Sequence, residues 1–343
     1  MKTFVYSLFL SLCFFSCDEP DTKGKEIINY YPYVDTYPVD HVNPIAETKK
    51  LPYLPGYPIH YNAGAVSYQN KLLLAVRIET FDRGLLNGKN SRVILTFADK
   101  EFRGYQGDQK IVLKHNGEEV DIEDPRLFSF KGEIWMAYNT TLSGVASGIR
   151  QMYLAKLDLT NGLPSNIEPK RIAYDKVETE KNWTPFEYEG ELYFISHLSK
   201  QNVFKVNPET GEAIEQSSQE TVLWPYGQLR GGSPALVLND NEYITFFHSS
   251  KHYILASGDQ KNIYFAGALT FSRKPPFEIL RMTKKPIMDS SYYNTENSKL
   301  IIFPTGILLE DDKISMLSGK NDDHLILSEM SLARLEQYLE PIS

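Results

Sequence analysis

Polar and charged side chains recur in this sequence at the edges of short apolar segments, where they could form one binding site. Asn62 precedes the first such segment, and Arg77 and Glu79 follow it. The later segments are flanked by Glu123-Asp124-Pro125-Arg126, Arg150, Lys181-Asn182-Trp183, Arg230, His248 and Gly319-Lys320-Asn321-Asp322. Carboxylates and amides bind hydroxyl groups, aromatic rings stack on sugar rings, and cations hold anionic groups. These residue types together predict a carbohydrate site.

Each motif taken alone also has a purely structural explanation. Asp124-Pro125 is a common turn pair, and Trp183 could simply pack in a core. His248 at a strand end is more often a structural histidine than a ligand, and Arg77 and Arg126 could be surface ion-pair partners of little energetic value. The functional interpretation is favoured because the unusual residues fall at the same end of five separate segments.

These five segments share one pattern, in which an apolar strand, a polar turn and a second apolar strand follow one another. Their turns contain Asn70, Gly132, Gly190, Asn241 and Asp312, which lie about 50 to 70 residues apart. A hairpin that recurs at such a period is typical of a β-propeller with one hairpin per blade. We therefore predict an all-β fold, a five-bladed β-propeller whose inner strand ends surround one central funnel.

The two ends of the chain differ from this pattern. Near the C-terminus, Leu332, Leu335 and Leu339 would share one face of a helix, which predicts a short helix within residues 328–339 that covers an outer blade edge. Residues 51–343 are assigned to one propeller domain. Residues 17–50 are assigned to a polar tether and an arm that packs against a blade.

Residues 1–16 have the features of a lipoprotein-type signal peptide, with a basic start and an apolar run too short to span a bilayer. Cys17 stands where this run ends, so we expect it to carry lipid and to anchor an exported protein to a bacterial membrane, in the periplasm or at the cell surface. The alternative is an ordinary secretory signal with a chance cysteine. The only other cysteine is Cys13, so catalysis by a thiol is excluded.

Composition excludes several other classes of function. The formal net charge of −8 argues against nucleic acid as a partner, because nucleic-acid sites are basic. The sequence has no glycine-rich nucleotide loop, no zinc-type Cys/His spacing and no EF-hand pattern. Neither a metal nor a cofactor is therefore expected.

Several motifs resemble glycoside hydrolase family 130 in their order along the chain. They are Glu123-Asp124-Pro125-Arg126, Lys181-Asn182-Trp183, Phe246-Phe247-His248, and Phe303-Pro304-Thr305-Gly306 followed by Gly319-Lys320-Asn321-Asp322. The likeness covers roughly residues 55–325. That family comprises five-bladed propellers, mostly β-mannoside phosphorylases with some β-mannosidases. The resemblance implies an enzyme that acts on an oligosaccharide, with inorganic phosphate as co-substrate if it is a phosphorylase.

The resemblance also implies roles for individual residues. Asp124 matches the general acid, whose proton reaches the glycosidic oxygen through a hydroxyl of the bound mannose. Contacts to the substrate are expected from Asn62, Arg77, Arg126, Trp183 and Asp322. Phosphate is expected to contact Arg150, Lys181 and His248. The family usually has two arginines in that region, and only Arg150 is evident.

The residue types do not decide whether water or phosphate is the nucleophile. Inversion by water requires a second carboxylate as base, for which Glu79 and Glu187 are the candidates. Inversion by phosphate requires no base but a cationic cradle, for which Lys181, Arg150, Arg230 and His248 would be suited. Export favours hydrolysis or binding, because a sugar phosphate is useful only where metabolism can take it up.

We therefore expect an enzyme of the cell envelope that cleaves or reversibly phosphorolyses a β-mannoside or related oligosaccharide with inversion. A non-catalytic glycan-binding lipoprotein with a degenerate pocket is the alternative from another class. A propeller that binds proteins ranks last, because it would not need a convergent polar funnel.

Overall fold

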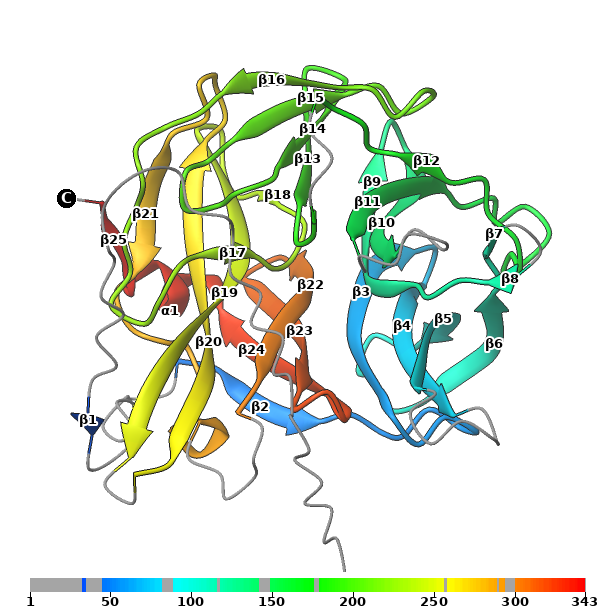
Figure 1. Cartoon of the computed structure of the whole chain (residues 1–343), viewed down its shortest axis with the longest axis horizontal. Helices are drawn as coiled ribbons and strands as arrows, with labels where there is room; N and C mark the ends of the chain where they lie inside the picture. Colours follow the sequence, from blue (N-terminus) through cyan, green and yellow to red (C-terminus); the bar gives the residue numbers. More distant parts are fainter. Residues whose placement is uncertain are drawn as a thin grey trace, which may run out of the picture. The chain divides into compact units, whose positions relative to one another are not determined.

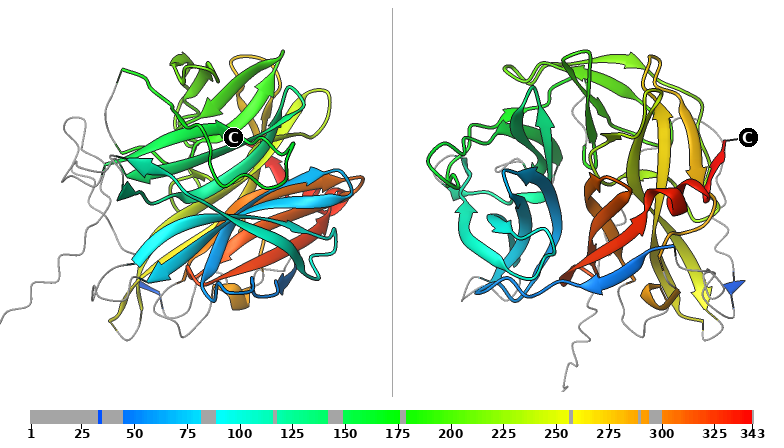
Figure 2. Two further views of the ribbon diagram at one scale, coloured as in Figure 1. Left: turned by 90° about the vertical axis from the view of Figure 1, so that its right-hand side faces the viewer. Right: turned by 180° about the vertical axis from the view of Figure 1, so that it is seen from behind.

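The computed structural model describes residues 33–34, 45–81, 89–115, 118–141, 149–175, 179–255, 258–288, 290–293 and 300–342. Within the compact unit that begins at Pro32, the strands form five separate main sheets arranged around a central axis (Figures 1 and 2). The chain is thus an all-β, five-bladed β-propeller, as the repeated hairpins predicted. The proposed signal peptide and Cys17 lie outside the described residues.

The first three blades are regular four-stranded antiparallel sheets. Blade one contains β3 (His60–Tyr68), β4 (Lys71–Phe81), β5 (Lys89–Ala98) and β6 (Tyr105–Ile111). Blade two contains β9 (Glu123–Phe130), β10 (Glu133–Thr141), β11 (Arg150–Lys156) and β12 (Lys170–Arg171). Blade three contains β13 (Thr184–Tyr188), β14 (Glu191–Ile195), β15 (Val203–Val206) and β16 (Ala213–Ser217). A two-stranded ladder of β7 (Lys114–His115) and β8 (Glu118–Glu119) connects the first two blades in sequence.

The last two blades recruit strands from both ends of the chain. Blade four contains β17 (Arg230–Gly231), β18 (Leu236–Val237), β19 (Glu242–Leu255), β20 (Gln260–Ser272), β21 (Ile279–Thr283) and β25 (Leu339–Pro341), with β1 (Tyr33–Val34) parallel to β19. Blade five contains β22 (Ile302–Glu310), β23 (Lys313–Lys320), β24 (His324–Ser331) and, outermost, β2 (Glu47–Lys50). A 3₁₀ helix, η1 (Ser290–Tyr292), and α1 (Leu332–Glu336) complete the elements.

The predicted turns are found in all five blades. Residues 69–70, 131–132, 189–190 and 311–312 each link two strands directly, and residues 238–241 join β18 to β19. In blades two and three both turn residues have positive φ, with Gly132 and Gly190 in the second position. Such two-residue turns match the twist of the flanking strands and favour glycine.

The C-terminal segment is only partly helical. Residues up to Ser331 belong to β24, and α1 has five residues, which begin after the capping hydroxyl of Ser331. Leu335 is fully buried, but Leu339 already belongs to β25, which pairs with β21. The helical periodicity therefore identified one turn of helix correctly and overestimated its length. Among the described residues, no helix is long and apolar enough to cross a membrane.

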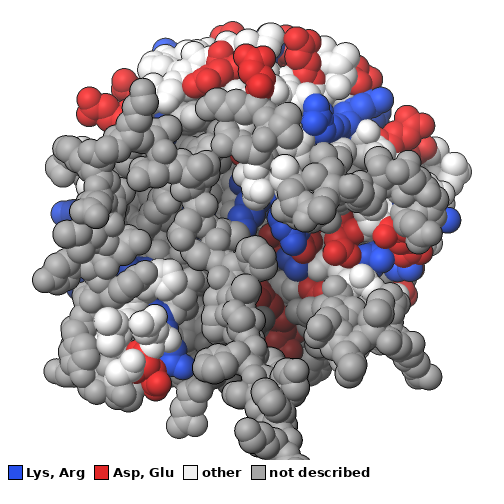
Figure 3. All heavy atoms as spheres, in the orientation of Figure 1, with Lys and Arg blue, Asp and Glu red and all other residues white. Residues whose placement is uncertain are grey.

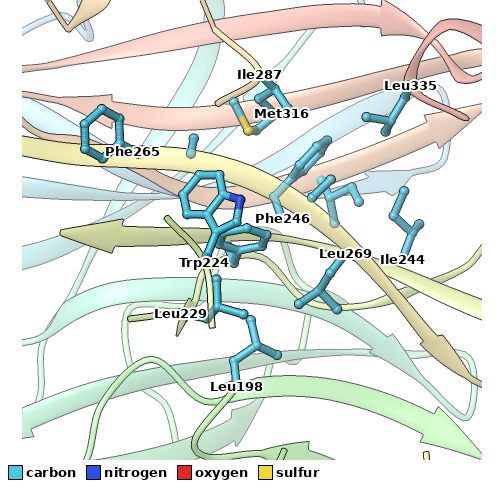
Figure 4. Packing of buried hydrophobic residues seen from close by; sticks show 14 of the residues in the cluster. Leu198, Trp224, Leu229, Ile244, Phe246, Phe265, Leu269, Ile287, Met316 and Leu335 are labelled. Atoms are coloured by element: carbon cyan, nitrogen blue, oxygen red, sulfur yellow. The ribbon is translucent and has the colours of Figure 1, made fainter. Parts of the chain in front are cut away.

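Apolar side chains fill the space between adjacent blades. The largest cluster joins blades three, four and five, and Figure 4 shows Trp224 and Phe246 packed among Leu198, Met316 and Leu335. Burial of such side chains contributes roughly 1.5–3 kcal/mol each. This packing fixes the inner strands and hence the positions of the polar residues at their ends.

Candidate active site

Two β-bulges bring side chains from neighbouring blades together at one end of the propeller axis, the funnel. The pairing of β3 with β4 skips Asn62, and the pairing of β9 with β10 is irregular between Glu123 and Arg126. Asn62 and Asp124 both have positive φ, at 49° and 51°, which Asn and Asp tolerate better than most residues. Bulges commonly re-aim side chains beside active sites. Here they allow the Asn62 amide to donate a hydrogen bond to Asp124 over 2.7 Å.

Asp124 is a buried carboxylate held by two nearby arginines and one amide. Its Oδ1 accepts hydrogen bonds from Asn62 and from Arg77 Nη1, the latter at 2.9 Å. Burial raises the pKa of Asp124, but the charges of Arg77 and Arg126 and these hydrogen bonds outweigh burial and lower it to about 2. Asp124 is therefore ionised at neutral pH in the free protein.

Arg77 lies at the centre of an ion-pair network. Its Nη2 lies 3.1 Å from Glu123 Oε1 and 3.2 Å from Glu79 Oε1, and its guanidinium lies over the ring of Tyr61. Glu123 is paired on its other oxygen with Arg150. Burial raises the pKa of Glu123, and the neighbouring Asp124 adds to this against the two arginines. Adjacent carboxyl groups of one motif thus differ in the direction of their pKa shifts.

A cationic group lies beside this network. His248 on β19 pairs with Arg230 on β17, and the carbonyl of Asn182 would lie 2.0 Å from a Cβ at Gly231. Only glycine permits this close approach, which brings Lys181-Asn182 next to Arg230. Among the described residues, neither Lys181 nor Arg230 forms an ion pair or a hydrogen bond through its side chain.

His248 is neutral despite its position in the funnel. Burial, followed by the charges of Arg230, Arg126 and Lys181, lowers its pKa well below the usual value. Its ring contacts Phe303, with centroids 4.2 Å apart, and its buried Nδ1 has no hydrogen-bond partner within the part of the chain that the structure describes. A neutral imidazole can donate a hydrogen bond from one ring nitrogen and accept one at the other.

Blade five completes the funnel with Asp322. This half-buried residue follows β23 in a positive-φ conformation and lies close enough to Tyr61 to affect its pKa. Gly319 on β23 packs directly against the amide of Asn62. In Figure 3, basic and acidic side chains lie next to one another in the hollow at the centre of the visible face.

The structure brings together most of the residues predicted from the sequence. Asn62, Arg77, Glu79, Asp124, Arg150, Lys181, His248 and Asp322 all lie at the funnel end of the blades. Three other candidates, Trp183, Arg126 and Glu187, are not placed for the roles predicted for them.

Trp183 is a core residue. Its side chain is 0% exposed, stacks on Phe204 and donates a hydrogen bond to Glu180 at 2.7 Å. It cannot stack on a sugar. Arg126 is also 0% exposed, and its guanidinium donates to the carbonyls of Gly232 and Asp124. It therefore ties blade two to blade four and contributes charge to Asp124 rather than contacting substrate.

Neither candidate base is placed to activate water. Glu187 lies near the turn of the third hairpin, at the opposite end of β13 from the funnel, where it accepts a hydrogen bond from the backbone of Lys131. Glu79 lies in the site, but its side chain is 1% exposed and accepts hydrogen bonds from Tyr61 and Ser91 while pairing with Arg77. Its contacts are those of a residue that holds Arg77.

Three residues of the site carried little or no signal in the sequence. The sequence indicates Arg230 only by its charge, and its pairing with His248 depends on the register of β17 with β19. Tyr61 precedes Asn62 directly but looks like any strand aromatic. Ser91 lies in β5, and a single serine in a strand has no distinguishing feature. Among the described residues, no group of three His, Cys, Asp or Glu side chains could hold a metal ion.

Comparison with known proteins identifies the family. A model of glycoside hydrolase family 130, described as β-1,4-mannooligosaccharide phosphorylase, matches residues 59–340. The chain therefore belongs to this family of mannoside phosphorylases and glycoside hydrolases and is an enzyme. No curated protein matches the chain.

Solved structures share the fold at low sequence identity. A β-1,2-mannobiose phosphorylase from Listeria innocua, in complex with β-1,2-mannobiose, is 13% identical with a TM-score of 0.61, over 87% of this chain and 94% of that one. A mannose phosphorylase from Leishmania mexicana, in complex with a phosphate ion, is 15% identical with a TM-score of 0.60, over 87% and 92%. A glycosyl hydrolase from Bacteroides ovatus is 14% identical with a TM-score of 0.62, over 83% and 87%.

Proposed function

We propose that this enzyme phosphorolyses a β-mannoside oligosaccharide with inversion, and that phosphate is bound by Lys181, Arg230 and His248. The observation that carries this proposal is the cationic group of the funnel. Lys181 and Arg230 lie beside a neutral histidine and, among the described residues, are not neutralised by carboxylates. Unpaired cations that converge on one place are suited to hold and orient a phosphate dianion.

Asp124 is the general acid in this proposal. Asn62, Arg77 and Asp322 surround the place where the sugar would bind, and Asp124 Oδ2 has no hydrogen-bond partner among the described residues. A sugar hydroxyl can therefore bind to this oxygen and pass a proton to the glycosidic oxygen. Arg150 is paired with Glu123, so its role is to support the network around the acid.

The reaction balances without a further reagent. A phosphate oxygen attacks the anomeric carbon from the face opposite the leaving group, and the bond from that carbon to the glycosidic oxygen breaks. Asp124 takes up a proton from solvent when phosphate and sugar are bound and passes it through the sugar hydroxyl to the leaving oxygen. The proton of hydrogenphosphate is released to solvent, and Asp124 is ionised again. The products are a sugar 1-phosphate and the shortened saccharide.

Binding of phosphate also prepares the acid. Asp124 is ionised in the free enzyme because nearby cations lower its pKa to about 2. A bound dianion beside it and the exclusion of water by the sugar both disfavour the carboxylate, so both raise its pKa toward that of a proton donor.

The test of this function is product analysis with and without phosphate. Soluble protein is incubated with β-1,4- and β-1,2-linked mannobiose, and free mannose is separated from mannose 1-phosphate. Sugar phosphate that forms only with added phosphate, together with a raised KM for phosphate in Lys181→Ala and Arg230→Ala, supports the proposal. Free mannose at the same rate regardless of phosphate would instead identify a hydrolase.

We further propose that the enzyme is exported and anchored to a bacterial membrane through a lipid on Cys17. The proposal is supported by the apolar run that ends at this cysteine and by the charged residues that follow it. In bacterial cells grown with a labelled fatty acid, the full chain should carry label in the membrane fraction. Cys17→Ala should lose the label, and an unlabelled wild-type chain would contradict the anchor.

A further inference from the structure

We infer that Ser91 is a positioning residue that holds Arg77 against the catalytic acid, and that the Arg92–Asp121 pair fixes Ser91 in turn. The inference rests on the proposed role of Asp124. Ser91 is buried in β5 of blade one, and its hydroxyl contacts Arg77 and Glu79 rather than Asp124. Its effect on the reaction must therefore pass through Arg77.

The Ser91 hydroxyl forms hydrogen bonds to both Arg77 and Glu79. Its oxygen accepts hydrogen bonds from Arg77 Nε at 3.1 Å and Nη2 at 2.8 Å. The same hydroxyl donates to Glu79 Oε1 at 2.9 Å. The Ser91 oxygen thus contacts both nitrogens on one edge of the guanidinium, Nε and Nη2. The single hydroxyl hydrogen is donated to Glu79.

This arrangement determines which part of Arg77 reaches the acid. With the Nε edge fixed by Ser91 and one face covered by Tyr61, Nη1 is the atom left to bind Asp124, at 2.9 Å. A guanidinium is a rigid planar fork, so a contact on one edge sets the direction of the other. Without the Ser91 hydroxyl, Glu79 and Glu123 would still attract Nη2, but Nε would lose its contact, and the angle at which Nη1 meets Asp124 would be less closely fixed.

A second set of contacts fixes Ser91 itself. Its backbone N–H donates to Asp121 Oδ1 at 3.1 Å, and Arg92 Nη1 donates both to Asp121 Oδ1 at 2.7 Å and to the Ser91 carbonyl at 2.8 Å. The Ile122 N–H also donates to the Ser91 carbonyl. Asp121 lies in the segment that leads into Glu123 and Asp124. The start of β5 is therefore bound to the backbone that carries the acid.

Kinetics of serine variants test this role. Ser91→Ala should lower kcat for mannoside phosphorolysis about 10- to 100-fold, the size of effect seen when an outer-shell partner of a metal ligand is removed. The KM for phosphate should stay within about twofold, because Lys181 and Arg230 do not depend on Arg77. Ser91→Thr keeps the hydroxyl and should restore most of kcat.

A matched control removes a buried hydroxyl elsewhere. Ser328 on β24 is fully buried and shares a hydrogen bond with Thr48 at 2.9 Å, far from Arg77 in sequence and in another blade. Ser328→Ala should leave kcat unchanged. An unchanged kcat in Ser91→Ala, or equal losses in Ser91→Ala and Ser91→Thr, would overturn the inference. If Asp124→Asn also retained full activity, the proposed acid itself would be wrong, and the two failures are thus distinguishable.

Discussion

At the scale of single residues, the surroundings of two adjacent carboxyl groups shift their pKa values in opposite directions. Asp124 accepts hydrogen bonds from Asn62 and Arg77, which hold it ionised, whereas burial dominates for Glu123 and raises its pKa. Pairs of titratable groups whose pKa values are pushed apart often mark the acid and base positions of an active site. The sequence motif contains both residues, but only their contacts separate them.

Replacing the proposed acid should abolish most catalysis without unfolding the protein. Asp124→Asn keeps an oxygen that can accept from Asn62 and Arg77 but cannot donate a proton as a carboxylic acid does. We expect kcat to fall about 10²- to 10⁴-fold, with a nearly unchanged melting temperature by circular dichroism. Asp311→Asn, at an exposed turn position that also has positive φ, is the control. Full turnover in Asp124→Asn would refute the assignment.

The buried Trp183 should support the fold rather than bind substrate. Trp183→Phe removes the indole N–H and leaves the buried Glu180 without that donor. An unsatisfied buried acceptor costs about 1–3 kcal/mol, so the free energy of unfolding in urea should fall by that amount. The KM for mannoside should change less than twofold. A large rise in KM at unchanged stability would show that Trp183 contacts the sugar after all.

At the scale of elements, the hairpins could be predicted because each is a local pattern of alternating residues around a turn. The bulges at Asn62 and Asp124 could not, because they depend on the register between strands. The same holds for β2 and β25, which pair with strands that are distant in sequence. Residues 47–50, assigned from sequence to the arm, form the outermost strand of blade five.

The closing strand β2 should contribute measurably to stability. It pairs with β24 along four residues, and its removal leaves β24 as an unpaired sheet edge. A protein that begins at residue 51 should therefore melt at a lower temperature and aggregate more readily than one that begins at residue 45. Equal melting temperatures and equal solubility in the two proteins would show that β2 is dispensable.

At the scale of the whole molecule, the site exists only because all five blades converge. Asn62 and Arg77 come from blade one, Asp124 and Arg150 from blade two, and Asp322 from blade five. Lys181 precedes blade three, and Arg230 and His248 belong to blade four. The sequence predicted this set because equivalent strand ends meet in a propeller. It could not place the candidate base Glu187, which lies at the far end of β13, and it could not show that Trp183 is buried in the core.

Three histidines whose pKa is lowered in the folded protein should make its stability depend on pH. Burial lowers the pKa of His60 and His324, and burial with nearby cations lowers that of His248 further. Below the ordinary histidine pKa of about 6.5, the unfolded chain binds protons that the folded protein does not. The free energy of unfolding should therefore fall as the pH drops below about 6.5, by up to about 1.4 kcal/mol per pH unit for each such histidine.

A variant of His248 can show how much this residue contributes to the change in stability with pH. Urea unfolding of wild type and His248→Gln at pH 7.5 and pH 5.5 should show a smaller loss of stability in the variant, because glutamine does not titrate. If His248→Gln lost as much stability as wild type between these pH values, His248 would be charged in the folded enzyme. Its proposed place as a neutral partner of phosphate, between Lys181 and Arg230, would then be wrong.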